Sequence, residues 1–107
     1  MSGHVRIYQN LAGNWTQIGG DIDGKAQGDG SGHSVSLSAD GSVVAIGAPD
    51  NDENGYISGH VRIYHNDNGT WTQIGSDIYG EDTGDKSGRS VSISDDGSVV
   101  AIGAIYN

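Results

Sequence analysis

The sequence contains no cysteine, no phenylalanine and a single proline. Without cysteine the chain can form no disulfide, no thiolate nucleophile and no cysteine-bound zinc site, and it carries no indication of its redox compartment. Basic residues are scarce too, because five Lys and Arg stand against 14 Asp and Glu, for a formal net charge of −9. Binding to nucleic acid or to an anionic membrane needs a basic face, so we expect neither partner.

Long hydrophobic runs are also lacking. No stretch resembles a signal peptide or a membrane span, so any export signal would lie outside these 107 residues. No stretch keeps the 3.6-residue periodicity of a helix, because 19 glycines interrupt every candidate. The apolar residues lie instead in short Val and Ile patches separated by turn residues, which is typical of an all-β domain.

The most informative feature of the sequence is an internal repeat. Residues 2–51 align without a gap on residues 58–107, at an offset of 56 residues, and about 35 of the 50 aligned pairs are identical. A period of this length is typical of solenoid and propeller proteins. The differences gather between the apolar patches, for example at Leu11/Asp67 and Lys25/Glu81, so we expect loops there.

Each period predicts four short strands. Residues 34–38 alternate between serine and an apolar residue, and Asp40-Gly41 predicts a hairpin into the next strand. That strand, at 43–46, is apolar on both faces, as expected for a strand buried between neighbouring sheets. The other two strands are predicted at 60–64 and 70–74. Four short antiparallel strands form one blade of a β-propeller.

Several motifs in these patches carry a family resemblance. They are S-G-H-S-V at 31–35 and A-I-G-A-P at 45–49 in the first repeat, S-G-R-S-V at 87–91, D-G at 96–97 and V-A-I-G-A at 100–104 in the second, with G-H-V-R-I-Y at 59–64 and W-T-Q-I-G at 71–75. Over essentially the whole chain this pattern resembles the FG-GAP repeat of integrin-α-like β-propellers. The resemblance implies a propeller fold and an extracellular or cell-surface location.

The sequence departs from that family pattern in two ways. Ser31 and Ser87 stand where the family has the Phe of its Phe-Gly pair, and Ile105 replaces the proline that ends the first repeat's motif. In addition, the first hairpin connection is too short to wrap the calcium ion that some integrin-like blades hold there. Calcium binding is therefore not transferred to the hairpin at residues 39–41.

The family's strand order divides this chain into a half blade, a full blade and a half blade. We expect strands three and four of one blade at residues 4–8 and 15–18, followed by one complete blade and by strands one and two of the next. A half blade exposes an unpaired strand edge, so we expect strand exchange between molecules to complete the ring. Each molecule supplies two blade equivalents, and we favour a trimer with six blades over a tetramer with eight. Every added molecule loses further translational and rotational freedom.

One acidic loop has the spacing of a cation site. Alternate residues from Asp50 onward carry side-chain oxygens, followed by a glycine that permits a sharp turn. The candidate ligands for calcium are Asp50, Asp52, Asn54, Tyr56 through its carbonyl, and Ser58. No glutamate stands at the twelfth position, which is Val61. A solvated, negatively charged turn is the interpretation we favour, because such polar clusters are common in loops.

The aromatic residues have two interpretations. Tyr8, Tyr64, Trp15 and Trp71 occupy repeated strand positions, where packing between blades is favoured over stacking on sugar rings. The tyrosines that do not repeat are predicted to lie in loops and are the candidates for ligand contact. They are Tyr56, Tyr79 and Tyr106.

No combination of residues indicates catalysis. His4 and His60 repeat on a strand, where packing is favoured over metal binding, and nothing selects a histidine and a carboxylate around one of the strand serines. The sequence therefore predicts a self-assembling β-propeller fragment, of natural or engineered origin, that serves as a structural or binding scaffold without a cofactor. The alternative is a lectin-like or adhesive module that binds carbohydrate or protein, assisted by calcium.

Overall fold

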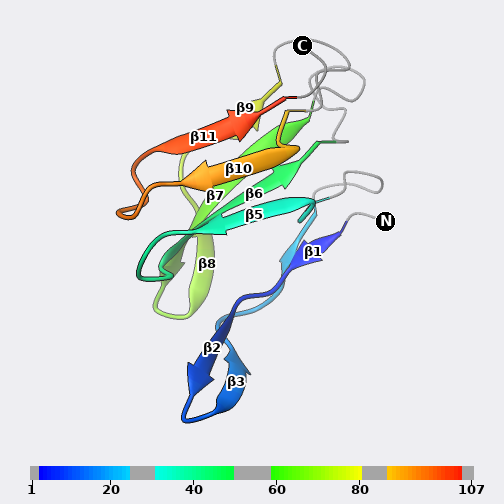
Figure 1. The fold of residues 1–107 in the computed structure, drawn as a ribbon. Helices are drawn as coiled ribbons and strands as arrows, with labels where there is room; N and C mark the ends of the chain where they lie inside the picture. The colour runs from blue at the N-terminus through cyan, green and yellow to red at the C-terminus, as the bar shows by residue number, and fades with distance from the viewer. Residues whose placement is uncertain (1–2, 25–30, 50–58, 81–86, 105–107) are drawn as a thin grey trace.

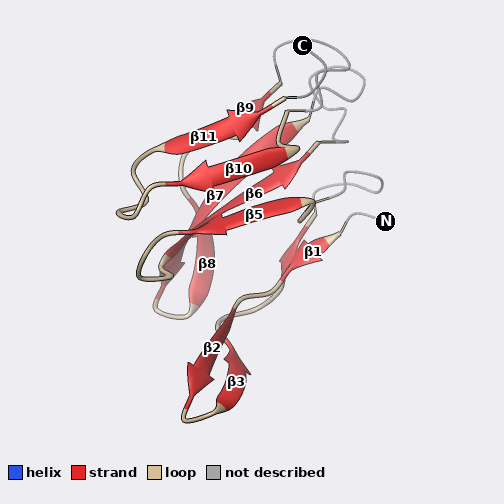
Figure 2. Cartoon of the chain, in the orientation of Figure 1, coloured by secondary structure: helices blue, strands red, loops and turns tan. Residues whose placement is uncertain are grey.

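The computed structural model describes residues 3–24, 31–49, 59–80 and 87–104 (Figure 1). This part of the chain is all β, without a helix, which confirms the predicted class (Figure 2). The strands are β1 (His4–Val5), β2 (Tyr8–Leu11), β3 (Asn14–Gln17), β4 (Ile22–Asp23), β5 (Ser34–Leu37), β6 (Val43–Ala48), β7 (His60–Asp67), β8 (Thr70–Gln73), β9 (Ile78–Tyr79), β10 (Ser90–Ile93) and β11 (Val100–Gly103).

The central sheet is an antiparallel meander in the order β5-β6-β7-β8, with β9 also paired to β7. Its longest ladder joins β6 to β7, from Val43 opposite His65 to Ala48 opposite His60. The strands predicted at 34–38, 43–46, 60–64 and 70–74 all lie in this sheet, and β6 and β7 are longer than predicted.

The fourth strand of the central sheet is divided in two. β8 pairs with the C-terminal half of β7, and β9 pairs with its N-terminal end. The Ile74 amide donates to the Ile63 carbonyl over 2.7 Å, and the Gly80 amide donates to the Gly59 carbonyl over 2.9 Å. The chain therefore follows β7 along its whole length but bulges away from it in the middle.

Residues 3–24 repeat this arrangement as an N-terminal unit, in which β2 pairs with β3 and β1 pairs with β4. The prediction of one strand over residues 4–8 is wrong, because the segment divides at Arg6 and Ile7 into β1 and β2. The equivalent residues of β7, Arg62 and Ile63, pair with β6 on their other side. Within the described residues no such neighbour supports Arg6 and Ile7.

The C-terminal hairpin, β10 and β11, packs on the face of β5 and β6. The Ser34 hydroxyl donates to the Gly88 carbonyl over 2.7 Å, and the Ile93 amide donates to the Ser36 hydroxyl over 3.1 Å. A Cβ atom on Gly47 would collide with the Gly88 carbonyl oxygen. Small residues on β5 and β6 therefore let the hairpin approach closely.

The core lies between the N-terminal unit and β6. It consists of Val5, Ile7, Ile22, Val44 and Ile46, with Ile18, Tyr64 and Trp71 packed around it. Val44 and the neighbouring Ala45 are both fully buried although their side chains leave opposite faces of β6. This confirms that β6 is covered on both faces, by the N-terminal unit on one side and the C-terminal hairpin on the other.

Candidate functional site

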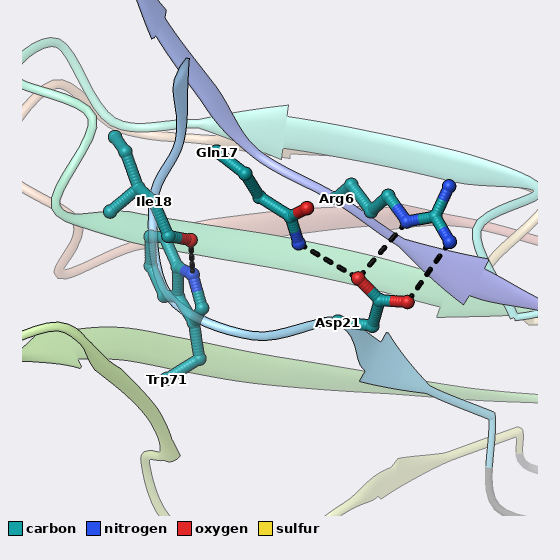
Figure 3. A network of polar contacts seen from close by, with 5 residues as sticks. All are labelled: Arg6, Gln17, Ile18, Asp21 and Trp71. Carbon is teal, nitrogen blue, oxygen red and sulfur yellow. Dashed lines mark hydrogen bonds and ion pairs between the residues drawn. The ribbon is translucent and has the colours of Figure 1, made fainter.

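A charged cluster occupies the bulge in each repeat. In the N-terminal unit the guanidinium of Arg6 donates to both carboxylate oxygens of Asp21, over 3.0 and 3.1 Å, and the Gln17 amide donates over 2.8 Å (Figure 3). The hydrogen bond from Arg6, followed by that from Gln17, lowers the pKa of Asp21 to about 2. The carboxylate thus stays ionised and fixes the bulge between β3 and β4.

The second repeat has the same cluster in a less exposed setting. Arg62 donates to Asp77 over 2.9 and 3.1 Å, Gln73 donates over 2.6 Å, and the Tyr79 hydroxyl lies 3.2 Å from the second carboxylate oxygen. Burial raises the pKa of Asp77, but the hydrogen bonds from Arg62 and Gln73 outweigh it and hold that pKa below its usual value. A carboxylate bound in this way is a poor general acid or base near neutral pH, so the cluster ties strands together.

The hairpin turns at Asp40 and Asp96 are built alike. One oxygen of Asp40 accepts hydrogen bonds from the Ser38 hydroxyl, the Ser42 amide and the Ser42 hydroxyl, over 3.0, 3.0 and 2.7 Å. Asp96 does the same with Ser94 and Ser98. Hydrogen bonding lowers the pKa of both carboxyl groups. These aspartates shape the turns.

The predicted calcium ligands lie outside the described residues, as do Tyr56 and Tyr106. Within the described ranges, no group of three or more His, Asp or Glu side chains is placed to hold a metal ion. Tyr79 is described, and the prediction that it lies in a loop is wrong, because it forms β9 opposite His60. A two-residue strand is too short for alternation to reveal it.

The repeated histidines and tryptophans differ in their surroundings. His60 is buried, with its ring edge-on to Tyr79 at a centroid distance of 6.1 Å, whereas His4 is exposed. The Trp71 indole N–H donates to the Ile18 carbonyl over 2.8 Å (Figure 3). Its equivalent Trp15 is 70% exposed. Trp71 therefore packs as predicted, and Trp15 has the same side chain without the same neighbour among the described residues.

This difference extends along both ends of the molecule. Ile22 is 6% exposed and its equivalent Ile78 is 39% exposed, while Ile93 is 9% exposed and its equivalent Leu37 is 47% exposed. Between repeats, the side chains are identical or nearly so, and only the neighbouring strands differ. At these exposed positions, the described residues therefore supply no packing neighbour like the one that the equivalent position of the other repeat has.

A shallow groove of about 390 Å³ lies on the C-terminal hairpin. Its lining residues are Ser90, Val91, Ser92, Ala101, Ile102 and Gly103. The equivalent face of β5 and β6 is covered by the C-terminal hairpin, through Ser34 and Ser36. On this groove, and along the free edge of β11, the described residues supply no such cover.

Comparison with protein-family models, curated protein sequences and solved structures gives no significant match. In the described residues there is also no helix long and apolar enough to cross a membrane.

The sequence analysis did not predict the Arg-Gln-Asp clusters. A signal for them existed, because all three residues are identical in the two repeats and the acidic one follows the arginine by 15 positions each time.

Proposed function

We propose that this chain is a self-assembling β-propeller segment that serves as a structural or binding scaffold without catalysis. The observation that supports it best is that the central sheet is one complete four-stranded meander, flanked by partial copies of itself. The N-terminal unit corresponds to the third and fourth strands of such a sheet, and the C-terminal hairpin corresponds to the first and second.

The same close backbone approaches recur at both junctions within the chain. A Cβ atom on Gly32 would lie 3.0 Å from the His4 carbonyl oxygen, and one on the equivalent Gly88 would lie 2.7 Å from the His60 carbonyl oxygen. Gly3 likewise approaches Ser31, as Gly59 pairs with Ser87. One junction repeated with a constant rotation generates a ring when that rotation divides a full turn.

Light scattering coupled to size exclusion tests the proposal on the 107-residue chain. Because each chain weighs 11.0 kDa, a six-bladed trimer has a mass of about 33 kDa and an eight-bladed tetramer about 44 kDa. We expect the trimer. A monomer that unfolds cooperatively at concentrations up to the millimolar range would overturn the proposal.

A further inference from the structure

We propose that β11 pairs with the β1–β2 segment of a second molecule in the register in which β6 pairs with β7. The groove on the C-terminal hairpin then receives the β5 region of that same second molecule. This inference rests on the proposed self-assembly and specifies its interface. Val99 lies opposite Gln9 of the second molecule, and Ala101 lies opposite its Ile7.

The register follows from a ladder that exists inside the chain. Val43 pairs with His65, and Ala45 pairs with Ile63. In the repeat, Val43 and Ala45 correspond to Val99, which directly precedes β11, and to Ala101 in β11. Their partners His65 and Ile63 correspond to Gln9 and Ile7 in the N-terminal unit. Both halves of the ladder are thus present on every molecule, at opposite ends.

The exposed side chains indicate the same partner. Ala45 is fully buried beneath its neighbours, whereas Ala101 is exposed, and Tyr64 packs against the core, whereas Tyr8 is 48% exposed. Pairing β11 with the β1–β2 segment of a second molecule supplies Tyr8 with the neighbouring strand that Tyr64 has in β6. The β5 region of the same molecule covers Ala101, as the C-terminal hairpin covers Ala45. A different strand could pair with the backbone groups on the free edge of β11, but it would leave Tyr8 and Trp15 uncovered.

The groove adds two hydrogen bonds to this arrangement. The Ser34 hydroxyl binds the Gly88 carbonyl and the Ser36 hydroxyl accepts from the Ile93 amide. The equivalent groups across the new junction are Ser90 with the Gly32 carbonyl, and Ser92 with the Leu37 amide. This contact covers Leu37, which is 47% exposed in the single chain.

Trp15 supplies a third contact. The Trp71 indole donates to the carbonyl of Ile18, which belongs to the preceding unit. By the same relation, Trp15 of the second molecule donates to the carbonyl of Ile74 of the first molecule. Ile74 is 44% exposed and Trp15 is 70% exposed. Burying both removes two large, mostly apolar side chains from water.

Disulfide cross-linking tests the register, because the chain has no cysteine to interfere. The Asn66 amide donates to the Ser42 carbonyl over 2.9 Å, so the next pair, Val43 and His65, does not exchange backbone hydrogen bonds. Such pairs have Cα atoms about 4.5 Å apart, within the range that a disulfide spans. The test variant is therefore Gln9→Cys with Val99→Cys.

Two matched variants control the experiment. Val43→Cys with His65→Cys places the same pair inside one chain and should form an intramolecular disulfide under the same oxidation conditions. Leu11→Cys with Val99→Cys shifts the partner by two residues on the same face, to a distance of about 7–8 Å, where bridging is strongly disfavoured.

We expect the Gln9/Val99 variant to give covalent oligomers under non-reducing electrophoresis, at more than ten times the yield of the Leu11/Val99 variant. If light scattering shows the oligomer but this pair does not cross-link, the register is overturned while self-assembly stands. Preferential cross-linking of Leu11 with Val99 would also overturn it. A monomer that cross-links neither pair contradicts both the register and self-assembly.

Discussion

The hairpin turns at Ala12-Gly13 and Asn68-Gly69 hold the same backbone conformation with different side chains. Ala12 has a φ of 54° and Asn68 a φ of 53°. Asparagine visits the left-handed region readily, whereas alanine is strained there. In both turns a side-chain oxygen, of Asn10 or of Asn66, accepts a hydrogen bond from the following glycine amide. The flanking strands and this bond, more than local preference, therefore impose the conformation of Ala12.

The Asp77 cluster gives a prediction about acid stability. The folded pKa of Asp77 is lowered, so the unfolded chain binds more protons as the pH falls below about 4. The stabilisation is complete above the unfolded pKa and is lost as the pH falls through the folded pKa. We expect Asp77→Asn to lower the free energy of unfolding by about 2 kcal/mol at pH 7 and to flatten its decline below pH 4.

Urea titrations from pH 7 to pH 2 measure this effect at a fixed protein concentration. Asp21→Asn is the matched control, because the same bonds form with more exposed side chains, where solvent screens the charges. It should reduce stability less than Asp77→Asn. Equal losses in the two variants, or an unchanged acid limb in Asp77→Asn, would contradict a stabilising role for the partly buried cluster.

At the scale of the strands, the sequence pattern predicts the strands that have clear alternation or an unbroken apolar run. Residues 34–38 and 43–46 meet this condition and form β5 and β6. β4 and β9 do not, since two residues show no period and their pairing depends on a bulge held by an arginine 15 residues earlier. Long-range partners of this kind leave no local signal.

The candidate site shows the same limit. Repetition predicts that exposed edges exist at both ends, but it does not tell which side chains are exposed. Ile22 and Ile78 are the same residue type at equivalent positions of the two repeats. They differ in burial because the complete central sheet packs against the N-terminal unit, whereas only the two-stranded C-terminal hairpin packs against the central sheet. The register of β6 and β7 does not follow from the repeat either, although a shift of one residue would move every side chain of a strand to the opposite face of the sheet.

A substitution in β11 should separate folding from assembly. A Cβ atom on Gly103 meets only the Ser90 side chain, which can rotate away, whereas one on the equivalent Gly47 strikes the Gly88 backbone. At the proposed junction, Gly103 faces the Gly32 backbone of a second molecule. We therefore expect Gly103→Ala to fold normally and to raise the concentration needed for assembly at least about tenfold, since overpacking costs about 1–3 kcal/mol.

Circular dichroism and light scattering across a dilution series measure the two effects. Gly20→Ala is the control, because nothing lies within 4 Å of an added Cβ atom there and its backbone is not strained. It should leave both measurements unchanged. Gly47→Ala should instead destabilise the fold itself. An oligomer of Gly103→Ala with unchanged concentration dependence would place the contact elsewhere.

At the scale of the whole molecule, the proposed junction would bring together molecules that carry net charge of the same sign. The groove and its proposed partners are serine, glycine, alanine and aliphatic residues, while each chain carries a formal charge of −9. Apolar burial and backbone pairing thus favour association, and the summed negative charge opposes it. Salt does not screen the contacts at van der Waals distance. It does screen the repulsion between the net charges of two molecules, because that repulsion acts over longer distances.

Assembly should therefore become stronger as ionic strength rises. Because the Debye length falls from about 30 Å at 0.01 M to about 10 Å at 0.1 M, most of the change is expected in this range. Light scattering of the unmodified chain at fixed concentration should show a larger mean mass at 0.1 M than at 0.01 M sodium chloride. Gly103→Ala, which weakens the proposed junction, is the control. Its mean mass should stay near that of the monomer at both salt concentrations. Dissociation on adding salt would mean that ion pairs between molecules outweigh the repulsion of their net charges, and it would contradict this prediction.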